Sequence, residues 1–388
     1  MKQLKLFSIF SLASIFLTSS IYNASSAKEA NSISACQLKR ISDWPLGPGF
    51  PRSDVLVNST GILRHLFIYV DFPDNKSNVA SKKFADKYFK ESKKFIEAQS
   101  YGKLRFVSEV LPKVYRIDKK SSIYGMTEDG KGIGWQLIQD AITAADSEID
   151  FSKYDFVTVL PPKNTKTIKT AGVISGGKDE YKSEEKNFST GIVIGGWYQD
   201  DLSSPGRGWT LFSHEVGHVL GITHPYFQQD GSPGGIWDLM GNGGTSVREF
   251  LGWHRFLLSW ITKEEMTCLS DGEIKPTSIK LAPIGSQSSG VKFAMVGLSD
   301  TQAIGIEVRR KNVYDNLSKN EEGVLVYLID TTKGDDEGII TILGNKKTVK
   351  EGQQLGSLKP GESVTYKGVT IKVSSSTKSG DSVEISKN

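Results

Sequence analysis

One segment of eleven residues, His214–His224, restricts the fold of this chain more than any other part of its sequence. It reads His-Glu-Val-Gly-His-Val-Leu-Gly-Ile-Thr-His and contains three of the five histidines. Because His214 and His218 are four residues apart, a helix presents both imidazoles on one face. Gly221 allows the chain to leave that helix with positive φ, so that His224 returns to the same face. The segment therefore predicts a helix that ends near Gly221 and three imidazoles that meet.

Three imidazole nitrogens with an open fourth position are typical of a catalytic zinc site. A structural zinc site takes four protein ligands, commonly cysteines, whereas this chain has two cysteines that are far apart. Glu215 would take the proton of the zinc-bound water as that water attacks a carbonyl carbon. The long pattern, H-E-x-x-H-x-x-G-x-x-H, argues against a solvated helix face with incidental histidines. We therefore expect one catalytic Zn²⁺, held by His214, His218 and His224.

A second signal follows the histidines, at Ile236–Gly241. Here the chain resembles the metzincins, zinc peptidases whose metal-binding helix is followed by a methionine-containing turn beneath the metal. The resemblance makes Met240 the candidate residue of this Met-turn; the alternative role for Met240 is core filling. It also implies an α/β metzincin-like zinc-peptidase domain, with a mixed sheet, long helices, the zinc helix and the Met-turn.

Within the metzincins, the chain is similar to the secreted, mainly bacterial immune inhibitor A-type peptidases over nearly all of residues 36–385. The segments that carry this resemblance are Val70–Asp74, Ser100–Lys103, Ile149–Asp155, Trp253–Arg255 and Gly323–Tyr327. Many members carry an acidic residue where His224 stands, so the third ligand is inferred from the spacing in this sequence. The resemblance implies a zinc endopeptidase that acts on protein or peptide substrates. The alternative is an exported binding or adhesion protein with a vestigial metal site.

The N-terminus has the pattern of a secretory signal peptide over residues 1–27. Lys2 and Lys5 precede an apolar stretch that is too short to span a bilayer, and small residues follow it. We expect a secreted, extracellular protein with no membrane span. A lipoprotein box ending at Cys36 lies too far beyond the apolar stretch to favour lipid anchoring. The formal net charge of +4 is too small for a general nucleic-acid binder.

Export also affects the interpretation of the cysteines. In an oxidising compartment, Cys36 and Cys268 most simply form a disulfide bond. Two alternatives remain open from the sequence: Cys36 as a thiolate ligand that blocks the zinc site of a latent enzyme, and two unpaired buried thiols.

Hydrophobic patterning predicts a lead-in segment and two domains after the signal peptide. Residues 28–58 form a lead-in segment with little periodicity. Residues 59–270 alternate between strands and helices and are assigned to the catalytic domain. Residues 271–388 hold only short β-rich runs, which predict an all-β, sandwich-like C-terminal domain. The elements expected in the catalytic domain are strands at 66–70, 104–107 and 155–160 and helices at 80–98 and 133–145.

Several further residues have two interpretations each. Tyr226 is a possible oxyanion stabiliser or a packing residue. His254 fits a core histidine better than a ligand. Asp71 and Asp74 could bind a structural Ca²⁺, but two carboxylates at a turn more often cap Asx turns. The acidic run Asp335–Glu337 is interpreted as a solvated loop.

The last expectation concerns the substrate. Metzincins bind an extended peptide against a sheet edge beside the zinc helix. The glycine-bounded run of Ile192, Val193, Ile194 and Gly195 is a candidate for that edge strand. An interior strand fits the same apolar run. Neither substrate preference nor oligomeric state can be read from the sequence.

Overall fold

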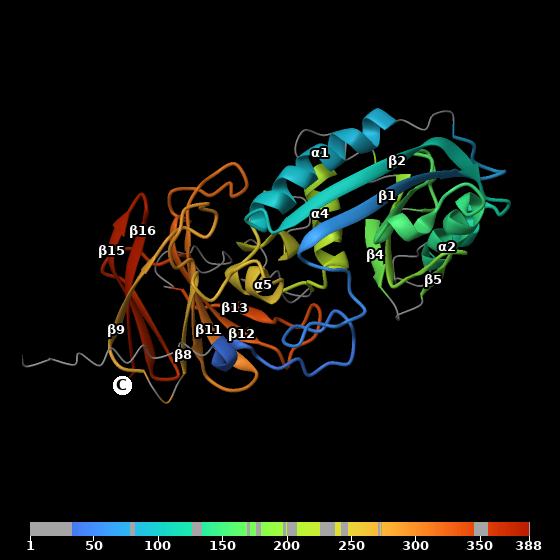
Figure 1. Ribbon diagram of the computed structural model, residues 1–388. Helices are drawn as coiled ribbons and strands as arrows, with labels where there is room; N and C mark the ends of the chain where they lie inside the picture. The colour runs from blue at the N-terminus through green and yellow to red at the C-terminus, as the bar shows by residue number, and fades with distance from the viewer. Residues whose placement is uncertain are drawn as a thin grey trace, which may run out of the picture. The chain divides into compact units, whose positions relative to one another are not determined.

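The computed structural model describes most of the chain after the signal segment. The described residues are 33–77, 82–125, 134–168, 171–175, 180–196, 199, 208–225, 237–241, 247–270, 272, 274–344 and 356–387. Residues 32–388 form one compact unit of mixed α/β structure with few helices and several sheets (Figure 1). The predicted signal peptide lies outside the described residues. No helix among the described residues is long and apolar enough to cross a membrane.

The first sheet has five strands in the order β2-β1-β3-β7-β4. Its strands are β1 (Gly61–Asp71), β2 (Leu104–Arg116), β3 (Phe156–Leu160), β4 (Ala171–Ser175) and β7 (Thr190–Ile194). The neighbouring pairs are parallel except for β4 and β7, which are antiparallel. Each of the strands predicted from apolar runs is present, although β1 and β2 are longer than expected.

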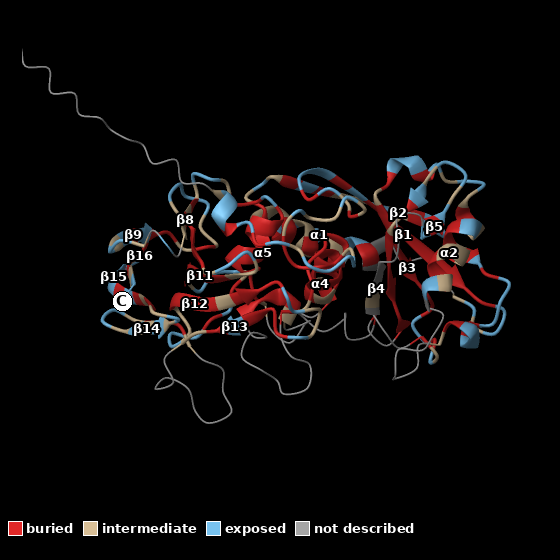
Figure 2. Cartoon of the chain, turned by 90° about the horizontal axis from the view of Figure 1, so that it is seen from below, coloured by how far each residue is buried: buried red, intermediate tan, exposed pale blue. Residues whose placement is uncertain are grey.

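Helices cover both faces of this sheet, which is why its central strands are apolar at consecutive positions. Side chains such as Phe67 and Tyr69 share one core with α1 (Lys82–Gln99) and α4 (Gly208–Val219). The alternate side chains Ile68 and Val70 share another core with α2 (Gly134–Ala145). Figure 2 shows how fully these strands and α4 are buried. The helices predicted at 80–98 and 133–145 are thus confirmed within two residues at each end.

The predicted substrate strand is not at an edge of this sheet. We expected Ile192–Gly195 to present free backbone groups, but β7 pairs with β3 on one side and with β4 on the other. The expectation was wrong because a continuous apolar run fits an interior strand equally well, and only the pairing distinguishes the two. Among the described strands, β4 and β2 form the two edges.

Two further sheets lie in the C-terminal region. One has the order β13-β12-β11-β10-β8 and the other the order β14-β15-β16-β9. The first of these comprises β8 (Met266–Ser270), β10 (Phe293–Gly297), β11 (Gln302–Arg309), β12 (Gly323–Asp330) and β13 (Ile340–Ile342). The second comprises β9 (Thr277–Leu281), β14 (Ser363–Tyr366), β15 (Val369–Thr377) and β16 (Gly380–Lys387). Since β8 pairs with β10, the sheet β13-β12-β11-β10-β8 includes a strand that precedes the expected domain boundary at 270/271.

The two C-terminal sheets share one buried cluster, as in a sandwich. Ile304 and Ile306 of β11 face the other sheet through this cluster. On the opposite face, side chains such as Tyr327 share a core with α5 (Gly252–Leu257) and with Cys36 and Leu38 of the lead-in segment. The lead-in segment is therefore part of the folded core.

The remaining elements are short. They are the 3₁₀ turns η1 (Ile33–Cys36), η2 (Ser121–Tyr124), η3 (Phe151–Lys153) and η5 (Leu239–Gly241) and the strands β5 (Tyr181–Lys182) and β6 (Asn187–Phe188). Strands β5 and β6 pair only with each other among the described strands.

Candidate metal centre

The helix predicted around His214 and His218 is α4, and it ends where the sequence indicated. Gly221 has a φ of +92°, which confirms the expected left-handed exit. The amide of Ile222 then donates to the carbonyl of Gly217, and the amide of Gly221 donates to that of His218. A side chain at Gly221 would also overlap Leu56 of the lead-in segment. This position therefore requires glycine for both its backbone angle and its close approach to Leu56.

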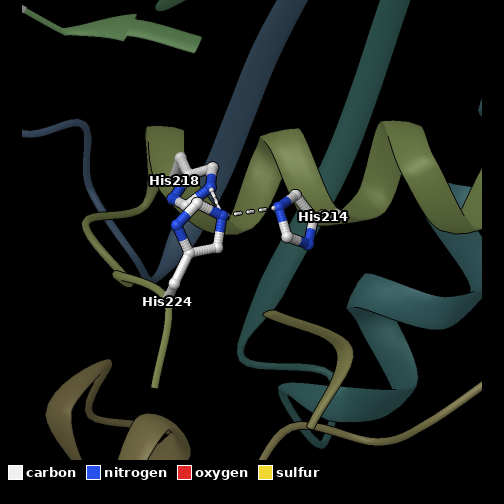
Figure 3. Close-up of side chains that lie close together, drawn as sticks. All are labelled: His214, His218 and His224. Atoms are coloured by element: carbon white, nitrogen blue, oxygen red, sulfur yellow. Dashed lines mark hydrogen bonds between the residues drawn. The ribbon is translucent and has the colours of Figure 1, made fainter. Parts of the chain in front are cut away.

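The left-handed exit brings the third histidine back to the helix. The Nε2 atom of His224 lies 3.2 Å from Nε2 of His214 and 3.1 Å from Nε2 of His218. Figure 3 shows the three imidazoles turned toward one another, two from α4 and one from the segment after it. With Zn–N distances of about 2.0–2.1 Å, nitrogens on a tetrahedral zinc ion stand roughly 3.3 Å apart. The two distances from His224 are close to this value, and the three ligand atoms all lie within 4.8 Å of one another.

The other ring nitrogen of each histidine has a hydrogen-bond acceptor. His214 Nδ1 lies 3.0 Å from the carbonyl oxygen of Leu239, and His218 Nδ1 lies 2.7 Å from that of Ile222. His224 Nδ1 lies 3.3 Å from a carboxylate oxygen of Asp335. Because these oxygens only accept, the proton belongs on Nδ1 and the lone pair on Nε2. Three lone pairs therefore converge, an arrangement that a bound cation stabilises.

Burial sets the charge of the two histidines on α4. It lowers the pKa of His214 to about 4, assisted by repulsion from His224, and it lowers the pKa of His218 well below its usual value. Both are consequently neutral at pH 7, as metal ligands must be. Burial also lowers the pKa of His224, but hydrogen bonding to Asp335 and the charge of Asp336 outweigh it, and the net shift is upward.

Glu215 lies on α4 next to the first histidine and is only 4% exposed. Its charge is one of the smaller causes of the upward shift in the pKa of His224. A buried carboxylate that follows directly after a histidine of the cluster is a candidate general base.

Met240 lies in η5 and is fully buried against the helix that carries the histidines. A Cβ atom on Gly217 would overlap its Sδ atom. The preceding residue, Leu239, supplies the carbonyl that accepts from His214. The turn therefore packs against α4 at Gly217 and accepts a hydrogen bond from His214, while the predicted role of Met240 in a Met-turn stays a prediction.

Asp238 holds this turn in place and is the hydrogen-bond partner of His254. One carboxylate oxygen accepts the amide of Met240, and the other accepts the amide of Leu251. His254 Nδ1 lies 2.8 Å from the second oxygen, and His254 is 2% exposed. Burial raises the pKa of Asp238, but His254 and these amides lower it by more, so the net shift is downward and the carboxylate stays charged. His254 is thus a buried core histidine with a partner, as the sequence favoured.

The remaining site predictions have mixed outcomes. Cys36 and Cys268 form a disulfide bond with Cα atoms 6.0 Å apart, which excludes Cys36 as a zinc ligand in this state. Asp71 pairs with Arg116 through two hydrogen bonds of 2.5 and 2.9 Å, and Asp74 accepts from the amide and hydroxyl of Ser121. Nothing in these contacts supports Ca²⁺ at either carboxylate. Tyr226 lies outside the described residues.

Sequence reasoning missed two acidic residues at the site. The run Asp335–Glu337 was interpreted as a solvated loop, but the amide of His224 donates to Asp335 Oδ1 over 2.6 Å. Asp336 Oδ1 lies 3.3 Å from His224 Nδ1. These aspartates are 111 or more residues beyond the histidine, and no local pattern links them to it. The interpretation as a solvated loop is therefore corrected for Asp335 and Asp336.

The described residues hold two groups that could bind a metal, and both contain His224. One is the histidine triad, and the other combines His224 with Asp335 and Asp336. No family model matches the sequence. A search of curated proteins gives no match either. The functional argument accordingly rests on the chemistry of this chain's own residues.

Proposed function

We propose that this protein is a secreted zinc endopeptidase of metzincin type. The observation that carries the proposal is the cluster of three imidazoles, in which His224 Nε2 lies 3.2 Å from His214 Nε2 and 3.1 Å from His218 Nε2, together with the buried carboxylate of Glu215 on the same helix. A structural zinc site needs no carboxylate at that position and takes a fourth protein ligand. Three nitrogen ligands with a general base describe a hydrolytic site instead.

Each residue of the site has a defined chemical task. His214, His218 and His224 would hold the ion through Nε2. A zinc ion bound there would polarise the substrate carbonyl and lower the pKa of a nearby water molecule. The Glu215 carboxylate would accept a proton from the attacking water and then donate it to the leaving amine nitrogen. Met240, which packs against Gly217, would fix the position of α4 and so of the two histidines that it carries.

The corrected sheet order supports a different strand as the site of substrate pairing. β4 is the outermost described strand at one edge of the first sheet, and it contacts α4. An extended peptide that adds to β4 would therefore run close to the metal-binding helix. We therefore assign substrate pairing, first expected of Ile192–Gly195, to β4, the edge strand that pairs with β7.

Secretion is supported by two independent features. The first is the signal-peptide pattern of residues 1–27. The second is the Cys36–Cys268 disulfide, a bond that persists in oxidising compartments and is rare in reducing ones. The disulfide also ties the lead-in segment to β8, so this segment would stay attached if the chain were cut between the two cysteines.

The central test is hydrolysis of casein by the zinc-loaded protein, with and without a chelator. We expect hydrolysis that the chelator abolishes and zinc restores. E215Q should lose about 10²–10⁴-fold in kcat/KM while keeping about one zinc ion per chain, because the amide fills the same space without acting as a base. E91Q is a matched control on the solvent-facing side of α1, where Glu91 forms a surface ion pair with Lys94. Its activity should equal that of the wild type.

Three results would count against the proposal. Hydrolysis that resists the chelator excludes a metal mechanism. Hydrolysis that survives E215Q excludes Glu215 as the base. Zinc binding without any hydrolysis favours the alternative of an exported binding protein with a vestigial site.

A further inference from the structure

The loop between β12 and β13 reaches from the C-terminal sheet to the third histidine. In this loop, Asp335 accepts the backbone amide of His224 through Oδ1 over 2.6 Å. Its other oxygen lies 3.3 Å from His224 Nδ1. Just beyond the loop, the amide of Ile340 donates to the carbonyl of Pro225 over 3.1 Å. His224 and the residue after it are therefore held in place by residues 111 or more positions further along the chain.

The three histidines differ in how they are oriented. His214 and His218 are fixed by the helix α4, and their Nδ1 atoms face neutral backbone carbonyls. His224 lies after the helix, in a segment without regular structure, and its Nδ1 faces carboxylates. A ligand on such a segment loses more conformational freedom when it binds a metal, unless another group already orders it.

We propose that Asp335 is a positioning residue of the metal centre, which makes metal affinity depend on the C-terminal sheet. It acts through His224 in two ways: it anchors the backbone amide, and it holds the proton on Nδ1 so that the Nε2 lone pair faces the metal. Asp336 Oδ1 lies at a similar distance from Nδ1, but only Asp335 also binds the backbone. The inference rests on the proposed zinc site.

The test measures the zinc dissociation constant of the full chain by competition with a chelating dye. D335A should bind zinc about 10–100-fold more weakly, the usual loss when a group that orients a metal ligand is removed. D335N should lose at least about threefold, because its amide oxygen still accepts but carries no charge. E337Q is the matched control: Glu337 lies in the same loop and accepts from Gly334, as glutamine would, without a contact to His224.

A second measurement separates positioning from general damage to the fold. In a H224A background, D335A should leave the residual zinc affinity unchanged, because Asp335 acts only through the missing ligand. An equal loss in both backgrounds would overturn the proposal, as would wild-type affinity in D335A. If D335A does not fold, D335N decides: a loss of at least about threefold supports the proposal and wild-type affinity overturns it.

These outcomes are distinct from failure of the proposed function. If the wild-type chain binds no zinc, the metal centre and this inference fail together. If the wild type binds zinc and D335A binds it equally well, only the role of Asp335 is refuted. If zinc binding depends on Asp335 but no peptide is hydrolysed, the role of Asp335 is supported and the enzymatic proposal fails.

Discussion

Gly217, between the two histidines of α4, offers the sharpest test of the packing around the candidate metal centre. A Cβ atom at this position would overlap Met240 Sδ and lie 3.1 Å from Met240 Cε. It would also lie 3.6 Å from a ring carbon of Phe250. Met240 and Phe250 are both fully buried, so neither side chain can move aside into solvent. Gly217→Ala should therefore strain the contact between α4 and the η5 turn.

The magnitude follows from two opposing effects. In a helix, alanine is favoured over glycine by about 1 kcal/mol. Overpacking a closed core costs about 1–3 kcal/mol. G217A should thus lower the free energy of unfolding by up to about 2 kcal/mol in the wild-type background. In a M240A background the overlap disappears, and the same substitution should raise the free energy of unfolding by about 1 kcal/mol.

Urea denaturation of the wild type, G217A, M240A and the double variant measures whether the effect of G217A on the free energy of unfolding changes sign between the two backgrounds. M240A alone should cost about 2–5 kcal/mol because it leaves a buried cavity. G172A is a control, because a Cβ there meets no heavy atom within 4 Å. If G217A stabilises the protein equally in both backgrounds, Met240 does not occupy the space against Gly217 and the packing argument is refuted. The zinc affinity of G217A should also fall, since the helix must shift relative to Leu239.

Two further predictions concern acid stability and substrate pairing. Burial raises the pKa of Glu265, but Lys292 at 2.6 Å and the other hydrogen-bond partners of Glu265 outweigh burial and lower this pKa from 4.5 to about 2. The ionised Glu265 therefore contributes its full stabilisation above about pH 4.5, and this contribution is lost as the pH falls toward 2. The difference in unfolding free energy between wild type and E265Q should therefore shrink on acidification, and a constant difference in urea midpoints would contradict this. In a peptide that pairs with β4, only every second amide faces the strand, so N-methylation should slow cleavage about 2–10-fold at alternate positions. Equal effects at successive positions, measured as kcat/KM, would exclude pairing of this kind.

Local sequence was sufficient to predict much of the geometry of the His214–His224 segment. The spacing of His214 and His218 predicted a shared helix face, and Gly221 predicted the left-handed exit that brings His224 back. Helix periodicity and the left-handed exit act over a few residues, so short-range geometry decides them. The hairpin turn at Lys367–Gly368, between β14 and β15, has the same local origin, since both residues have positive φ.

The pairing of Cys36 with Cys268 was decided by counting rather than by geometry. With only two cysteines in an exported chain, one disulfide is the simplest arrangement, and the structure contains it. No sequence rule, however, placed β8 in the same sheet as β10 or made the lead-in segment part of that sheet's core.

Only the tertiary structure decided where β7 lies and which groups reach His224. An apolar run indicates that a strand is buried, but it does not indicate how many strands pair with it. The structure shows that β7 is paired on both sides and that β4 is the edge strand. The contact between Asp335 and His224 joins residues 111 positions apart, on a loop of one sheet and after a helix that covers another. Such contacts depend on how whole layers pack together, and that packing is a property of the entire chain.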